Sequence, residues 1–179
     1  MTNDATATPA TPAAPPAPIV PPEMSRPVAI GRIGLGLDFT VMATPDECVA
    51  LAKRMTIPTL ARLVCRFSLT PAPQRRIRAL GRLEIDVTQI CVVSLDPFSS
   101  TIVEDFVVNF VPAGRETPEL DFDAEDEIPF TGDILDLGEA AAEQLGLALD
   151  PFPRKPGAEL PPDANDGPEN AFAALLGRK

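Results

Sequence analysis

Arginines recur at closely spaced, mostly even-numbered positions in two neighbouring segments of this 179-residue chain. A guanidinium group presents a planar fork of N–H donors, so a row of such groups can bind the oxygens of phosphates or carboxylates. The candidate anion-binding residues of these segments are Arg62, Arg66, Arg76, Arg78 and Arg82. Two further candidates, Arg154 and Lys155, follow a predicted helix, where they can contact phosphate or complement the negative end of the helix.

An acidic segment, residues 116–127, offers the opposite chemistry. It contains seven acids and no base: Glu116, Glu119, Asp121, Asp123, Glu125, Asp126 and Glu127. These carboxylates can imitate phosphate and hold a basic protein, or they can simply keep a loop soluble. Binding of Mg²⁺ is less expected, because carboxylates on a flexible loop lack the fixed geometry that this ion requires.

The residue types that are absent exclude several classes of enzyme. The sequence has no histidine, tryptophan or tyrosine, so it cannot form a Ser–His–Asp or Cys–His catalytic group. It has no glycine-rich phosphate loop, and its three cysteines, Cys48, Cys65 and Cys91, are far apart and odd in number, so no disulfide framework is expected. We therefore expect no catalytic residue and no cofactor, in a soluble protein of a reducing compartment.

The charge is distributed unevenly along the chain, although its net value is −11. Residues 26–82 contain ten bases and three acids, whereas residues 83–179 contain five bases and 21 acids. A protein that binds bare duplex nucleic acid is normally basic overall. Any contact with RNA is therefore expected to come from the basic half of the chain.

Alternating apolar and polar residues predict a sheet that positions these charges. Strands are predicted at residues 32–42, 61–69, 77–95 and 101–111. A capping box at residues 44–47 predicts a helix that closes before Pro58, and a second box at residues 136–139 predicts a helix to about Leu149. This order predicts an α+β domain with two main helices and an antiparallel β-sheet, either open or barrel-like.

A hairpin with its turn at residues 70–74 would place arginines of its two strands directly opposite one another. Matching the apolar positions of the two strands places Arg66 opposite Arg78 and Arg62 opposite Arg82. Like charges in opposed positions destabilise a sheet, which suggests a bound anion. The anion is RNA phosphate, an acidic protein surface or the chain's own acidic segment; the alternative is an ordinary solvated face.

Both ends of the chain differ in composition from its middle. Residues 1–27 are dominated by proline, alanine and threonine and are expected to form a disordered tail. A chain lacking residues 1–23 is expected to fold equally well. Residues 28–158 are expected to form the domain, and residues 159–179 a flexible tail with a short terminal helix carrying Phe172 and Leu175.

The second half of the chain contains the stretch VTQICVVSLDPFSSTIVEDFVVNFVP, then the acidic segment, then DILDLGEAAAEQLGLALDPFPRKPGA. In this order the features resemble the YceD family of bacterial proteins, which is named for its role in the accumulation of large-subunit ribosomal RNA. The resemblance covers roughly residues 28–158, and the phrase PRKPGA is closest to the alphaproteobacterial branch. It implies a cytoplasmic protein involved in the synthesis, processing or stability of 23S ribosomal RNA, and it supplies no catalytic mechanism.

The sequence departs from the family at one position. Many relatives carry a C-x-x-C pair where this chain has Cys91 and Ser94. A single thiolate without histidine is a poor start for a zinc site, so we expect no stoichiometric zinc. Cys91 has the apolar parity of its predicted strand and is expected to be a buried, small hydrophobic residue.

The resemblance and the charge pattern together favour a non-enzymatic factor in ribosome biogenesis. Its expected partner is pre-ribosomal RNA or a ribosomal protein of the large subunit, and no membrane is involved. One alternative is an enzyme that processes or modifies ribosomal RNA with Mg²⁺-binding carboxylates. Another is an interaction adaptor whose proline-rich tail binds a groove.

Overall fold

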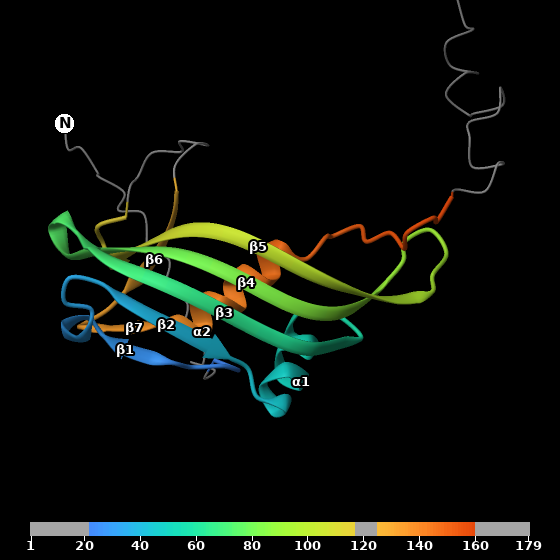
Figure 1. Cartoon of the computed structure of the whole chain (residues 1–179), viewed down its shortest axis with the longest axis horizontal. Coiled ribbons are helices and arrows are strands. Elements are labelled where there is room, and N and C mark those ends of the chain that lie inside the picture. Colours follow the sequence, from blue (N-terminus) through green and yellow to red (C-terminus); the bar gives the residue numbers. More distant parts are fainter. Residues whose placement is uncertain (1–21, 117–124, 160–179) are drawn as a thin grey trace, which may run out of the picture.

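A long, arched sheet forms one layer of the protein, in a computed structural model that describes residues 22–116 and 125–159 (Figure 1). Its five strands, in spatial order, are β2 (Leu37–Met42), β3 (Thr59–Ala72), β4 (Arg76–Ile90), β5 (Pro97–Pro112) and β6 (Asp126–Phe130). Neighbouring strands are antiparallel except β5 and β6, which are parallel.

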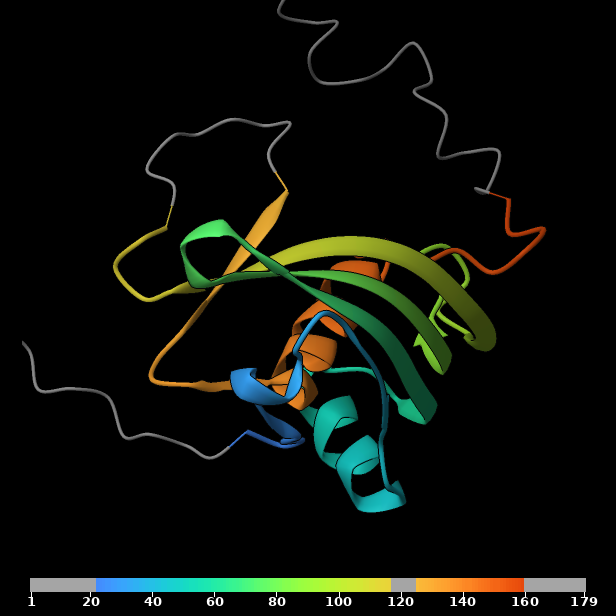
Figure 2. The ribbon, with the colours of Figure 1, turned by 60° about the vertical axis from the view of Figure 1, so that its left-hand side comes forward.

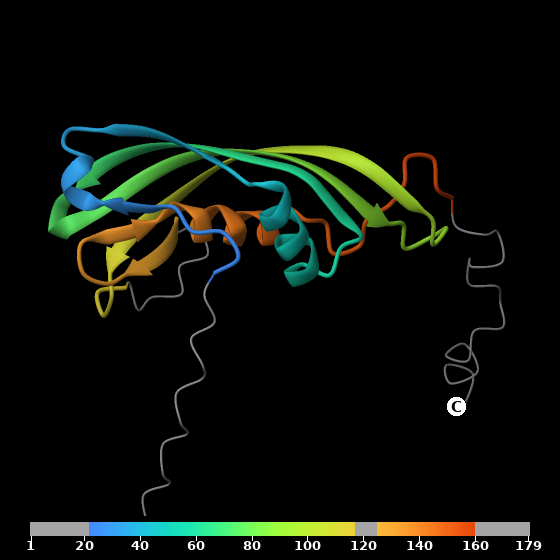
Figure 3. The same cartoon turned by 90° about the horizontal axis from the view of Figure 1, so that it is seen from below.

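The second layer lies beneath the concave side of this sheet, as Figures 2 and 3 show. It consists of a small antiparallel pair, β1 (Pro27–Ala29) with β7 (Ile134–Asp136), and the helices α1 (Pro45–Arg54) and α2 (Leu137–Ala148). No other described element covers the convex side, which we call the outer face. The α+β prediction is confirmed, with an open sheet rather than a closed barrel.

The core forms where the inward positions of β3 and β4 meet α2. Phe67, Leu69, Leu83 and Ile85 are at most 2% exposed, and Leu145 of α2 is fully buried. Burial of such side chains contributes about 2 kcal/mol each. The period of two predicted for both long strands is confirmed, because the exposure of their side chains alternates along most of each strand.

Local sequence signals explain both helix starts. The Thr44 hydroxyl accepts a hydrogen bond from the Glu47 amide at 3.3 Å, and the Glu47 carboxylate accepts one from the Thr44 amide at 2.8 Å. The first capping box is therefore confirmed. The second capping box, predicted at residues 136–139, is only half formed. The Asp136 carboxylate accepts hydrogen bonds from the amides of Gly138 and Glu139, as predicted. The Glu139 carboxylate does not complete the box and pairs instead with Arg54 at 2.8 Å.

Several predicted boundaries were wrong because turns replace the ends of strands. The strand predicted at residues 32–42 is β2 and begins at Leu37, because a 3-10 turn and Gly34, with φ +55°, precede it. The strand predicted to reach residue 95 ends at Ile90 and gives way to a turn. The end of the acidic segment is also not a loop, since Asp126 opens β6.

The segment before β1 packs onto the domain. Met24 is completely buried, and the Arg26 amide donates a hydrogen bond to Asp136 at 2.7 Å. The Arg26 guanidinium donates to both carboxylate oxygens of Glu47 at 2.8 Å. The packed part of the chain therefore begins before Val28. The remainder of the predicted tail, residues 1–21, and the predicted terminal helix lie outside the described residues.

Neither described helix is long and apolar enough to span a membrane.

Candidate functional site

The hairpin between β3 and β4 determines which arginines face one another. Its turn is formed by residues 73–75, with Gln74 and Arg75 at φ +63°, rather than by residues 70–74. Arg66 therefore lies opposite Arg82, not opposite Arg78.

The rest of the predicted register was wrong for the same reason. Arg62 lies opposite Asp86, and Arg78 opposite Thr70. The register shifted because β3 continues as extended chain through residues 70–72, which moves the centre of the turn by two residues. Neither of the two predicted like-charge pairs exists. A different like-charge pair, Arg66 with Arg82, forms instead.

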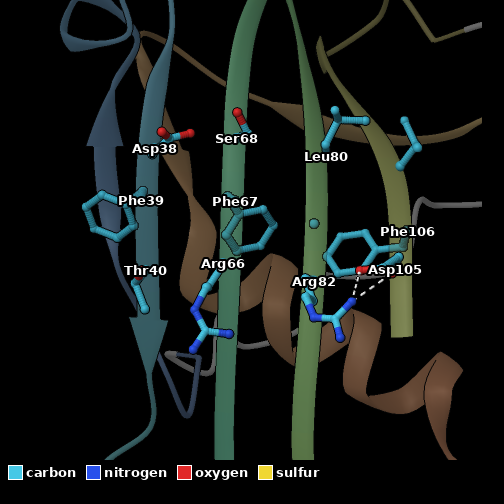
Figure 4. A pocket seen from close by; sticks show the side chains of 12 residues that line it. Asp38, Phe39, Thr40, Arg66, Phe67, Ser68, Leu80, Arg82, Asp105 and Phe106 are labelled. Carbon is cyan, nitrogen blue, oxygen red and sulfur yellow. Dashed lines mark hydrogen bonds and ion pairs between the residues drawn. The ribbon is translucent and has the colours of Figure 1, made fainter. Parts of the chain in front are cut away.

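Carboxylates of β4 and β5 lie among these arginines on the outer face. The Arg62 Nε donates to Asp86 at 2.7 Å, and Arg66 forms an ion pair with Glu84. The Arg82 Nη1 donates to both oxygens of Asp105, at 2.9 and 3.0 Å (Figure 4).

These acids are residues that the sequence analysis did not include in the site. The signal was present, because Glu84 and Asp86 have the same parity as Arg82 in one strand. Arg62 and Arg66 lower the pKa of Glu84 by hydrogen bonding, with Arg66 contributing most.

The end of the acidic segment also pairs with this face. Arg78 forms an ion pair with Glu125, which also accepts a hydrogen bond from Asn109 at 2.9 Å, and both contacts lower the pKa of Glu125. The Arg76 Nη1 donates to Glu127 at 2.8 Å. RNA phosphate, an acidic protein surface and the chain's own acidic segment were the three anions considered for these arginines. The structure places the end of the chain's own acidic segment against Arg76 and Arg78.

The other predicted acidic residues are divided between exposed positions and the undescribed part. Glu116 and Asp126 are exposed, whereas Glu119, Asp121 and Asp123 lie outside the described residues. Within residues 22–116 and 125–159, no group of three His, Cys, Asp or Glu side chains is arranged to hold a metal ion.

A hollow of about 670 Å³, which we call the arginine trough, lies among β2, β3, β4 and β5. Its charged lining residues are Arg66, Arg82, Asp38 and Asp105, and its apolar lining includes Leu80, which is 52% exposed. Figure 4 shows the Arg66 and Arg82 side chains at neighbouring positions on β3 and β4, with α2 behind the sheet. The Arg66 and Arg82 side chains are each about half exposed. The trough therefore offers charges of both signs beside apolar surface.

Arg154 and Lys155 are not part of this trough. Both are exposed in the segment that follows α2, where the Lys155 Nζ lies 3.8 Å from Asp96. This contact lies where β4 ends and β5 begins. Eight residues of extended strand, or about 27 Å, separate the end of β4 from Arg82. The structure thus divides the predicted anion-binding residues between two places.

Cys91 lies in the turn after β4 and is completely buried. The prediction of burial is confirmed, but its placement in a strand was wrong, because the strand ends one residue earlier. Its Sγ accepts a hydrogen bond from the Ser94 amide at 3.4 Å. Hydrogen bonds from the Ser94 side chain, and then from the backbone amides of Ser94 and Lys155, lower the pKa of this thiol to about 6.

The ionisation of Cys91 provides a direct test of this turn. Burial raises the pKa of Cys48, and raises that of Cys65 to about 12. Thiolate absorbance at 240 nm that develops between pH 5 and 8 is therefore expected to come from Cys91 alone, with a midpoint near pH 6. Ser94→Ala is expected to move the midpoint upward by about one pH unit, whereas Ser68→Ala, in the trough, is not. A midpoint above pH 8 in the unmodified protein would contradict the geometry.

One of the comparisons with known proteins identifies a family. The family model described as large ribosomal RNA subunit accumulation protein YceD matches residues 80–174. The match covers more than half of the chain and includes most of β4, all of β5 to β7, and α2. No curated protein and no solved structure gives a match. The chain belongs to the YceD family.

Proposed function

We propose that this protein is a non-enzymatic, cytoplasmic factor in biogenesis of the large ribosomal subunit. It supports the accumulation of 23S ribosomal RNA by holding a component of the precursor particle on its outer face. The family description names large-subunit ribosomal RNA accumulation. The observation that carries the proposal is the outer face itself, which no described element covers and which contains the arginine trough.

The charge of this face favours a ribosomal protein over bare RNA as the direct partner. Each of the five arginines of β3 and β4 on this face has a carboxylate within ion-pair distance. A surface that tracks phosphates is normally strongly basic, whereas arginine mixed with apolar side chains is typical of protein interfaces. Leu80 and Val103, each about half exposed, provide apolar surface near the arginines.

The double variant Arg66→Gln with Arg82→Gln tests the trough. Its stability is expected to stay within about 1 kcal/mol of the unmodified protein, because exposed ion pairs contribute little and one like-charge pair is removed. Its capture of large-subunit precursor components is expected to fall at least tenfold. The measurement is affinity purification from cells, with protein and RNA identified before and after nuclease treatment. Arg32→Gln with Arg75→Gln makes the same change of charge outside the trough and is the control.

The outcomes separate the parts of the proposal. Ribosomal protein that remains after nuclease treatment supports a protein partner, whereas loss of all partners would show that RNA is bound directly. Equal capture by the trough variant and its control would remove the trough from the site. Cells depleted of this protein are expected to contain less 23S ribosomal RNA, and an unchanged level would contradict the proposed function.

A further inference from the structure

The β5 strand has a long edge that pairs with no described strand. Its partner β6 contacts only residues 108–112, whereas β4 pairs along residues 97–110. On the side away from β4, residues 97–107 therefore present backbone N–H and C=O groups without a strand partner in the described part of the chain. An open edge of this kind, about 37 Å long at 3.4 Å per residue, is a template for another strand.

The two other edges of the sheet are less suitable for strand addition. The β2 edge is six residues long, and the guanidinium of Arg26 donates a hydrogen bond to the Met42 carbonyl at its end. The β6 edge is five residues long and includes Pro129, which has no amide hydrogen. The open β5 edge is longer than either of them.

This edge is acidic on both sides of the sheet. Strands β5 and β6 contain four acids and no lysine or arginine. Glu104 and Asp105 are neighbours on β5 and project to opposite sides, and both are exposed. Asp126, where β6 begins, is exposed as well. Among the described residues, neither Glu104 nor Asp126 forms an ion pair, so both charges are free to attract a cation.

We propose, on the basis of the proposed function, that the β5 edge binds an extended, lysine- or arginine-rich segment of the ribosomal protein partner as an added strand. Backbone hydrogen bonds supply the affinity in this mode of recognition, and alternate side chains supply the specificity. Basic side chains of the added strand meet Glu104 on one side of the sheet, and the alternate, aliphatic side chains meet Val103 on the other. The net charge of −11 increases the rate at which such a segment arrives.

The test uses a fluorescent ten-residue peptide of alternating lysine and valine and the full chain. The control peptide has the same sequence and charge but is N-methylated at every residue, so it cannot donate backbone hydrogen bonds. Fluorescence anisotropy is expected to show at least tenfold tighter binding of the first peptide. Hydrogen exchange is expected to slow at residues 97–107 and to stay unchanged at residues 37–42. Equal affinity of both peptides, or protection elsewhere, would overturn the proposal.

Charge variants locate the binding on the protein. Glu104→Lys is expected to weaken binding of the lysine–valine peptide at least fivefold. Asp38→Lys makes the same change of charge on the exposed β2 edge and is expected to weaken it less than twofold. Equal losses would show that the peptide responds only to net charge, which would overturn the edge as its site.

The results can be distinguished from those that test the proposed function. If the peptide does not add to β5 while depletion still lowers 23S ribosomal RNA, the edge proposal fails alone. If the peptide protects residues 97–107 while depletion changes nothing, the edge is a peptide-binding site of a protein with another function.

Discussion

Removal of residues 1–27 is expected to lower the free energy of unfolding by about 4 kcal/mol, whereas removal of residues 1–21 is expected to leave it unchanged. The longer deletion removes Met24, which is completely buried, and the paired contacts from Arg26 to Glu47. Loss of a buried methionine side chain alone costs about 2–5 kcal/mol. For a domain of this size the melting temperature would fall by on the order of 15 °C.

The same deletion has a characteristic pH dependence. Hydrogen bonds from Arg26, reinforced by the Thr44 amide, lower the pKa of Glu47 from 4.5 to about 2 in the folded protein. A lowered pKa contributes stability that is fully present above the unfolded value, near 4.5, and is lost as the pH falls toward 2. The chain that lacks residues 1–27 is therefore expected to lose less stability between pH 4.5 and pH 2 than the full chain.

Two measurements decide this prediction. Thermal and urea unfolding of the full chain and of both shortened chains give the stabilities, and repetition at pH 2.5, 3.5, 4.5 and 7 gives the dependence. Glu47→Gln in the full chain is the matched control, because it removes the ionisable partner and retains Met24. If the chain that begins at Val28 is as stable as the full chain, the packing of the segment before β1 is not what stabilises the domain.

Gly81→Ala is expected to destabilise the protein by about 2 kcal/mol. The ring of Phe106 lies across Gly81, and an added Cβ would approach ring carbons to between 2.0 and 2.5 Å. The ring would have to leave its position beside Phe67, where the two rings meet edge to face with centroids 5.8 Å apart. The change therefore costs both the steric clash and a packed aromatic pair.

A glycine elsewhere in the chain serves as the control. At Gly146 in α2 an added Cβ would have its nearest neighbours outside the helix at 3.6 Å, in the Met55 side chain, which is ordinary contact. Gly146→Ala is expected to stabilise the protein by about 0.5–1 kcal/mol, since alanine is the better helix former. The variant Phe106→Val is expected to tolerate Gly81→Ala at lower cost than the unmodified protein does, as urea unfolding will show. Equal costs in both backgrounds would show that the ring is not the obstacle.

Features that depend only on neighbouring residues could be predicted from the sequence. Alternation along β3 and β4 identified the inward side chains, because successive residues of a strand point to opposite faces. Thr44 and Glu47 marked the start of α1, because a capping box is complete within four residues. The quoted motifs of the second half also identified the family, which the match over residues 80–174 confirms.

The register of the central hairpin required the tertiary structure. Both Pro71 and Pro73 are compatible with a turn, and an antiparallel pairing keeps the same inward parity when its register shifts by an even number of residues. The apolar pattern alone therefore fits the predicted register and the observed one equally well. The packing of Met24 was also hidden in the sequence, because a single apolar residue in a proline-rich segment forms no periodic pattern.

The charge of the candidate site was decided only by the tertiary structure. Along the chain the bases and acids occupy separate halves, which suggested a basic face that binds an external anion. In space, Arg78 meets Glu125, 47 residues away, and Arg76 meets Glu127, 51 residues away. These contacts form because β6 returns to the sheet beside β5, two strands from β4, which contains both arginines. Separation of charge along a sequence does not predict its separation in space, since strand pairing joins segments that are far apart in the chain.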